Sequence, residues 1–180
     1  MQADDPSEGM RAAFFRDLHG RRLHGFALLL TLGDRSRAAR LAADAMADGT
    51  AHIDELRHPE RAAAWLRARV VRATRGMGRG GPRQGDRLQA LSAIDADAGL
   101  LAGLTALGLV ERAALIASSV ERLDRRDVAT IVGKDGSALD TLLSRSRLRY
   151  ARRFATAAPE GVPAGPVTER VREVAAKAMA

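Results

Sequence analysis

The chain has 180 residues, of which 46% are hydrophobic, so it can bury the core of one ordinary domain or of two small ones. It contains no cysteine, which excludes disulfides, thiolate metal sites and cysteine nucleophiles. The net charge of +7 favours an acidic partner: nucleic acid, a membrane face or an acidic protein. The longest apolar run is too short to span a bilayer, so we expect a soluble, cytoplasmic protein.

The first third of the sequence has the apolar spacing of helices. Apolar residues recur every three or four positions from Arg11 to Leu32. Gly33 then predicts a helix end, and Asp34 predicts the N-cap of a second helix. The second helix is predicted to break at Gly49, and Pro59 is placed in the first turn of a third helix.

A segment rich in glycine, proline and arginine separates this part from a second helical part. Its composition predicts a flexible basic linker. It contains a G-x-G-x-x-G pattern, but a helix precedes it and no strand pattern occurs, so nucleotide binding is not expected. We therefore predict an all-α fold with two small helical domains, the second containing a helix-turn-helix. The predicted segments are 10–75 (first domain), 76–87 (linker), 88–158 (second domain) and 159–180 (Pro-containing linker and tail helix).

The stretch from Asp124 to Phe154 has the pattern of a helix, a tight turn and a second helix. Such units commonly place their second helix in the major groove of DNA. Three leucines are expected to point inward and hold the unit together: Leu139, Leu142 and Leu143. The basic side chains along the second helix are suited to phosphate contacts.

The order and spacing of these segments resemble the extracytoplasmic-function (ECF) sigma factors, which direct bacterial RNA polymerase to promoters. The run FFRDLHGRRLHGFALLLTLGDRSRAARLAADAM resembles the opening helix pair of their region 2. The run LRHPERAAAWLRARVVRATRG resembles the helix that is built on an A-W-L core and followed by basic residues. The run LLAGLTALGLVERAALIASSVERLDRRDVATIVGKDGSALDTLLSRSRLRY resembles region 4.

The resemblance implies a DNA-binding subunit that works with core RNA polymerase at promoter DNA and is open to control by an anti-sigma factor. The residues that it implies for DNA binding are Arg67, Arg69, Arg72, Arg125, Arg126, Lys134, Thr141, Ser144, Arg145, Arg147 and Arg149. Those that it implies for polymerase binding are Arg37, Arg40, Leu41 and Asp44.

The predicted recognition helix departs from the family pattern. Gly136, Ala138, Asp140 and Leu142 stand where polar or charged residues are usual. An aspartate facing phosphates is repulsive, and each lost base contact costs about 1–3 kcal/mol of discrimination. The alternative interpretation is therefore a sigma-like interaction module that binds an anti-sigma factor or another regulator and has lost promoter recognition. A third interpretation is a generic helix-turn-helix regulator that dimerises through its first domain.

Residues for catalysis or metal binding do not cluster in the sequence. His19 and His24 do not share a helix face, and His52 and His58 flank a short polar segment. The acidic pairs lie in polar stretches that offer no partner to shift a pKa, and no serine stands in a nucleophile-elbow context. We therefore expect no enzymatic activity, no metal and no cofactor.

Overall fold

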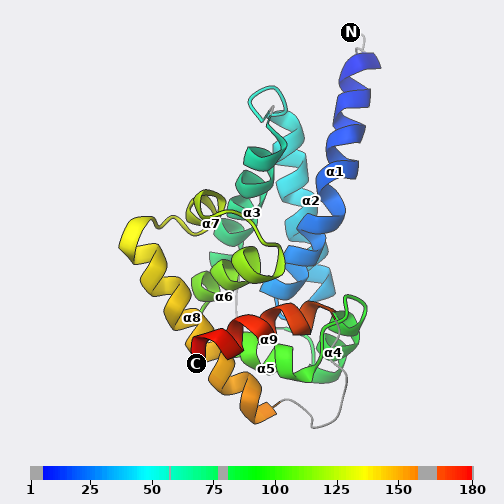
Figure 1. The fold of residues 1–180 in the computed structure, drawn as a ribbon. Coiled ribbons are helices and arrows are strands. Elements are labelled where there is room, and N and C mark those ends of the chain that lie inside the picture. Colours follow the sequence, from blue (N-terminus) through cyan, green and yellow to red (C-terminus); the bar gives the residue numbers. More distant parts are fainter. Residues whose placement is uncertain (1–5, 57, 77–80, 158–165, 180) are drawn as a thin grey trace.

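The computed structural model describes residues 6–56, 58–76, 81–157 and 166–179, and every regular element within these ranges is a helix. The predicted all-α class is confirmed (Figure 1). The elements are α1 (Pro6–Leu30), α2 (Arg35–Ala51), α3 (Pro59–Arg75), α4 (Gln84–Ser92), α5 (Ala98–Thr105), α6 (Leu109–Leu115), the π-helical turn η1 (Ile116–Val120), α7 (Arg125–Val132), α8 (Gly136–Ala157) and α9 (Pro166–Met179).

The tight turn predicted between the first two helices is present. Gly33 has a φ of 82°, a left-handed conformation that glycine adopts at little cost. Asp34 caps α2, because its carboxylate accepts a hydrogen bond from the backbone N–H of Arg37 at 3.0 Å. A Cβ atom at position 33 would lie 2.6 Å from the carbonyl oxygen of Arg87. The glycine therefore also lets the start of α4 approach this turn closely.

Gly49 does not end α2, so the predicted break is wrong. The helix continues to Ala51, and Gly49 is buried where α2 meets α1 and α3. A Cβ atom at Gly49 would lie 2.8 Å from Cδ2 of Leu66 and 3.1 Å from Cε1 of Phe15. The glycine thus serves close packing of three helices, at a cost of about 1 kcal/mol in helix propensity relative to alanine.

The segment predicted as a linker is partly helical. Residues 77–80 lie outside the described residues, and α4 begins at Gln84 rather than after Arg87. The Nε–H of Arg87 donates to the carbonyl oxygen of Pro82 at 3.0 Å, which holds the start of this helix against the segment before it.

The two halves of the chain are packed together. Their buried apolar side chains form one continuous core, in which α3 packs on α7, and α6 and η1 contact α1. Two arginines add polar ties between the halves. Arg67 on α3 pairs with Glu121 just after η1, and Arg112 on α6 donates to the carbonyl oxygen of Leu30 at 2.7 Å. The division into two domains stays a prediction.

The C-terminal helix α9 lies against the body of the molecule (Figure 1). It packs on α8 and η1, and its Val171 is buried. The hydroxyl of Thr168 donates to the carbonyl oxygen of Asp95 at 3.5 Å. Residues 158–165, which contain part of the predicted second linker, lie outside the described residues. In the described ranges, no helix has the length and apolar character needed to cross a membrane.

Candidate nucleic-acid interface

The segment predicted to bind DNA consists of α7, a short turn and α8. Asp124 caps α7 by accepting a hydrogen bond from the N–H of Asp127 at 2.8 Å, and Gly133 ends the helix with a φ of 67°. The inner face of α8 packs on the core, as predicted, through Leu139, Leu142 and Leu143. Its opposite face therefore remains on the surface.

A shallow hollow lies along the exposed start of α8. Its lining is Lys134, Ser137, Ala138, Thr141, Leu142 and Arg145. Three residues predicted to contact DNA are exposed in or beside it: Lys134, Thr141 and Ser144. Ser137, Ala138 and Thr141 in this lining have short, exposed side chains.

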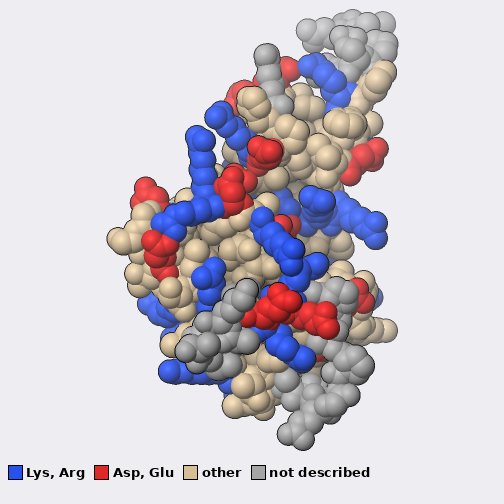
Figure 2. Space-filling view, viewed as in Figure 1, with Lys and Arg blue, Asp and Glu red and all other residues tan. Residues whose placement is uncertain are grey.

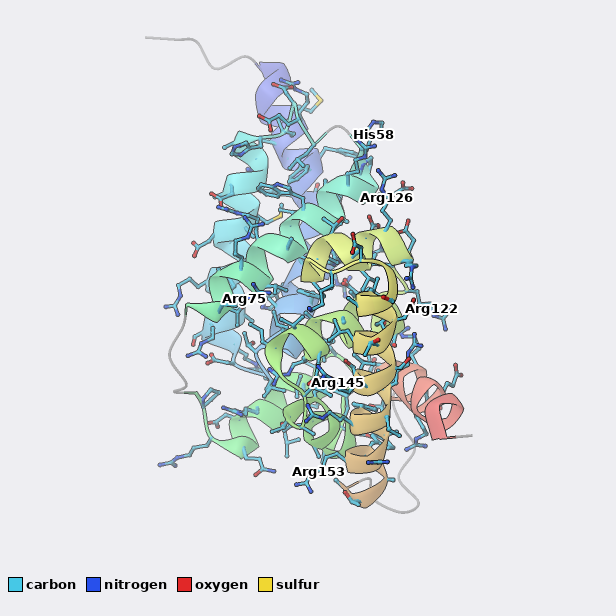
Figure 3. The ribbon with its side chains drawn as sticks, turned by 90° about the vertical axis from the view of Figure 1, so that its left-hand side faces the viewer. His58, Arg75, Arg122, Arg126, Arg145 and Arg153 are labelled. Atoms are coloured by element: carbon cyan, nitrogen blue, oxygen red, sulfur yellow. The ribbon has the colours of Figure 1, made fainter. Side chains whose placement is uncertain are left out.

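Two further hollows continue the first one across the molecule. All three are lined by Lys134, and the second and third also share Arg75 and Val110. We call these joined hollows the basic trough. Its cationic lining residues are Arg72, Arg75, Lys134, Arg145 and Arg149. Figure 3 shows this side of the molecule and labels Arg75 at the end of α3 and Arg145 on α8.

The excess of positive charge distinguishes the basic trough from the neighbouring surface. Figure 2 shows a face on which basic and acidic side chains are interspersed. Among the described residues that line the basic trough, by contrast, Glu111 is the single acid. Arg72, Arg75 and Lys134 make no ion pair with any described residue, so their charges are available to a partner.

Glu111 holds two arginines of α8 in place. Its buried carboxylate lies 2.9 Å from Nε of Arg145 and 3.0 Å from Nη1 of Arg149, and it accepts the N–H of Gly108 at 3.0 Å. Burial alone would raise the pKa of Glu111. The hydrogen bonds from Gly108 and Arg149 and the charges of the two arginines outweigh burial and keep that pKa below its ordinary value. The three side chains together retain one positive charge.

The lowered pKa of Glu111 predicts an acid-sensitive contact between α6 and α8. A carboxylate with a lower pKa in the folded state stabilises the fold above its unfolded pKa, and this contribution is lost as pH falls through the folded pKa. We expect Glu111→Gln to lower the free energy of unfolding at pH 7 by about 1–3 kcal/mol. Denaturant unfolding of both proteins from pH 7 to pH 3 should show the difference shrinking. A difference in the free energy of unfolding that stays constant from pH 7 to pH 3 would contradict this account.

The sequence suggested that Asp140 presents an unopposed negative charge to DNA. In the structure, however, Asp140 is paired. Both of its carboxylate oxygens accept hydrogen bonds from Arg125, which also donates to the carbonyl oxygen of Gly136 at 2.9 Å. The hydrogen bond from Arg125 lowers the pKa of Asp140, and the same bond raises the pKa of Arg125. Arg125, predicted to bind DNA, thus joins α7 to α8.

The three arginines of α3 predicted to bind DNA have different surroundings. Arg67 is only 2% exposed and pairs with Glu121, so it cannot reach a phosphate in this structure, and its prediction is corrected. Arg69 pairs with Asp48 and lies over the ring of Trp65, 5.5 Å from its centroid. Arg72 is exposed and lines the basic trough.

The residues predicted to bind polymerase lie on α2. Leu41 is 2% exposed and belongs to the hydrophobic core, so it is not available to a partner in this structure. Arg40 and Asp44 are exposed. Arg37 is partly buried, and its Nε lies 3.6 Å from Oδ2 of Asp34 at the start of the helix. The surface of α2 therefore offers Arg40 and Asp44 but not the predicted apolar contact.

Two further arginines predicted to bind DNA, Arg126 and Arg147, lie on α7 and α8. Arg126 is exposed on α7 and does not line the basic trough. Arg147 is half-buried, and its Nε has no hydrogen-bond partner among the described residues. Sequence reasoning missed Arg75, which follows Arg72 by three positions and so shares its helix face. It also missed Glu111, whose local signal is that of a capping residue early in α6.

Comparison of the chain with protein-family models, curated proteins and solved structures finds no match. The described residues contain no group of three or more His, Asp or Glu side chains that could hold a metal ion.

Proposed function

We propose that this protein is a DNA-binding subunit of the ECF sigma type, which directs core RNA polymerase to promoters through α7 and α8. The observation that carries the proposal is the basic trough, which is lined by cations from α3, the α7–α8 turn and α8 and, among the described residues, by a single acid, the buried Glu111. A row of cations of this kind suits the phosphates of a duplex, because their neutralisation releases counterions.

The arrangement supports phosphate contacts more strongly than base reading. Arg72, Arg75 and Lys134 are exposed and unpaired among the described residues, so phosphates can approach them without breaking an ion pair. Base edges would face Ser137, Thr141 and Ser144 on the exposed side of α8. These short hydroxyl side chains cannot make the bidentate contacts of Arg, Asn or Gln, so we expect modest sequence discrimination.

A second function, the binding of a regulatory protein, is favoured by the internal pairing of the arginines. Arg125 is held by Asp140, while Arg145 and Arg149 share Glu111. Ion pairs within the protein reduce the positive charge that is available to a polyanion. They also hold the paired side chains in one conformation. In this alternative the basic trough binds an acidic segment of a regulator, and promoter recognition is absent.

Transcription with purified components tests the first function against the second. We expect the full chain, added to core RNA polymerase and fragments of its source genome, to give run-off transcripts with discrete start sites. The double variant Arg75→Ala/Lys134→Ala should lose these transcripts. The matched control Arg16→Ala/Arg21→Ala removes the same charge from exposed positions on α1 that do not line the basic trough, and it should keep them. Absence of transcripts with the wild-type chain would contradict the sigma-type function.

A further inference from the structure

A separate cavity lies between two of the first helices, α1 and α3, and the C-terminal half of the molecule. It has a volume of about 490 Å³ and is lined by residues of α1, α3, η1, the loops beside them and α9. This volume is within the range of about 300–1,000 Å³ that is usual for small-molecule sites. None of the cations of the basic trough lines it, so it is a different site.

Much of the lining of this cavity is hydrocarbon. Leu18, which is 43% exposed, leaves part of the lining accessible from solvent. The π-helical turn η1 contributes both of its terminal residues, and π-helical turns are frequent at functional sites. The main apolar side chains are Phe26, Leu29, Ile94, Ile116, Val120 and Leu123.

The charged part of the lining has an excess of positive charge. Arg67 and Glu121 satisfy each other, and Glu60 is the remaining acid. Arg22 makes no ion pair with any described residue. The Nε of Arg170 is buried without a hydrogen-bond partner in the described part of the chain.

His19 adds a polar group to the lining of the cavity but does not change the charge of the lining at neutral pH. It is buried and lies edge-on to the ring of Phe15, with the centroids 4.8 Å apart. Burial, followed by the charges of Arg67 and Arg22, lowers the pKa of His19. Its imidazole is therefore neutral at pH 7, and it has one ring nitrogen that can donate a hydrogen bond to a ligand and one that can accept a hydrogen bond.

We propose that this cavity binds a small amphipathic carboxylate. Its hydrocarbon part lies against the apolar wall and its carboxylate lies at Arg22 and Arg170. Two cations without a carboxylate partner suit one anionic group, whereas the apolar wall suits an aliphatic body. Because the lining comes from both halves of the chain, the ligand binds their packed arrangement and stabilises it. This inference goes beyond the proposed function and does not depend on DNA binding.

Calorimetric titration of the full chain with decanoate tests the proposal, and 1-decanol serves as the uncharged counterpart. We expect decanoate to bind at least about tenfold more tightly than decanol, which corresponds to about 1.4 kcal/mol. Arg22→Met/Arg170→Met should remove this difference while leaving decanol binding unchanged. Arg21→Met, an exposed neighbour outside the cavity, should keep it. Ala63→Trp, which places a bulky ring in the lining, should weaken the binding of both compounds.

Three results would overturn the proposal. The first is the absence of saturable decanoate binding to the wild-type chain up to about 1 mM, a dissociation constant that corresponds to about 4 kcal/mol. The second is equal affinity for decanoate and decanol, since the cations would then play no part. The third is unchanged decanoate binding in the Arg22→Met/Arg170→Met variant, because the carboxylate would then lie elsewhere. The first two measurements use the wild-type chain and so do not depend on how the variants fold.

Discussion

Replacing Glu121 with alanine is expected to lower the free energy of unfolding by about 3–5 kcal/mol. The substitution leaves the guanidinium of Arg67 buried without a counter-charge, and breaking a buried ion pair from one side has a cost of this size. The carbonyl oxygen of Ala63, which accepts from Nη1 of Arg67 at 2.8 Å, cannot replace the carboxylate. Denaturant unfolding followed by circular dichroism measures the change.

Two further variants separate the ion pair from a general effect of charge. Glu60→Ala removes an acid from an exposed position on α3, and we expect a change within about 0.5 kcal/mol. Arg67→Met/Glu121→Leu replaces both partners with apolar side chains and should recover most of the loss. If Glu121→Ala is no more harmful than Glu60→Ala, the pair does not join the two halves as described.

Arg112→Met is expected to lower the free energy of unfolding by about 3 kcal/mol or more. The guanidinium of Arg112 donates to the carbonyl oxygens of Leu30, Leu104 and Leu107 at 2.7–3.0 Å. Hydrogen bonds from a charged group contribute about 1.5–3 kcal/mol each, although not additively. Burial, with a smaller effect of Arg87, lowers the pKa of Arg112 to about 10, so the group is still charged at pH 7.

Arg126→Met is the matched control for Arg112→Met, because Arg126 is exposed on the neighbouring helix α7. We expect it to change the stability by less than about 0.5 kcal/mol. Both variants are compared with the wild-type chain by denaturant unfolding at pH 7. Equal stabilities of the two variants would show that the three carbonyl contacts of Arg112 are not stabilising.

The parts of the fold that the sequence predicted correctly have local signals. Asp34 carries the side-chain oxygen that caps a helix, and Pro59 fits a first helical turn because it lacks an N–H. The predicted break at Gly49 is wrong because glycine gives the same local signal at a helix end and at a close helix contact. Only the approach of Leu66 from another helix distinguishes the two cases.

The candidate site was less predictable, because pairing across the fold decides which cations are free. Charge spacing along α3 does not distinguish Arg67 from Arg72, although Arg67 is buried against Glu121, 54 positions further along the chain. The pairing of Asp140 with Arg125 likewise depends on how α7 and α8 pack. The burial of Leu41, by contrast, was predictable, because it stands in the helical apolar pattern of α2.

The salt dependence of duplex binding tests the role of the basic trough most directly. Fluorescence anisotropy of a labelled duplex is measured with the full chain over a range of salt concentrations. We expect weak binding with little sequence preference, and a linear fall of log K with log salt. Arg75→Ala/Lys134→Ala should weaken binding to all duplexes about equally and reduce the slope by about 2, because each lost phosphate contact removes about 0.9.

The control Arg16→Ala/Arg21→Ala, which removes the same charge outside the basic trough, should leave the slope within about 0.5 of the wild-type value. No binding of the wild-type chain even at low salt, or equal slopes for the two double variants, would contradict the assignment of the basic trough as the DNA-binding surface.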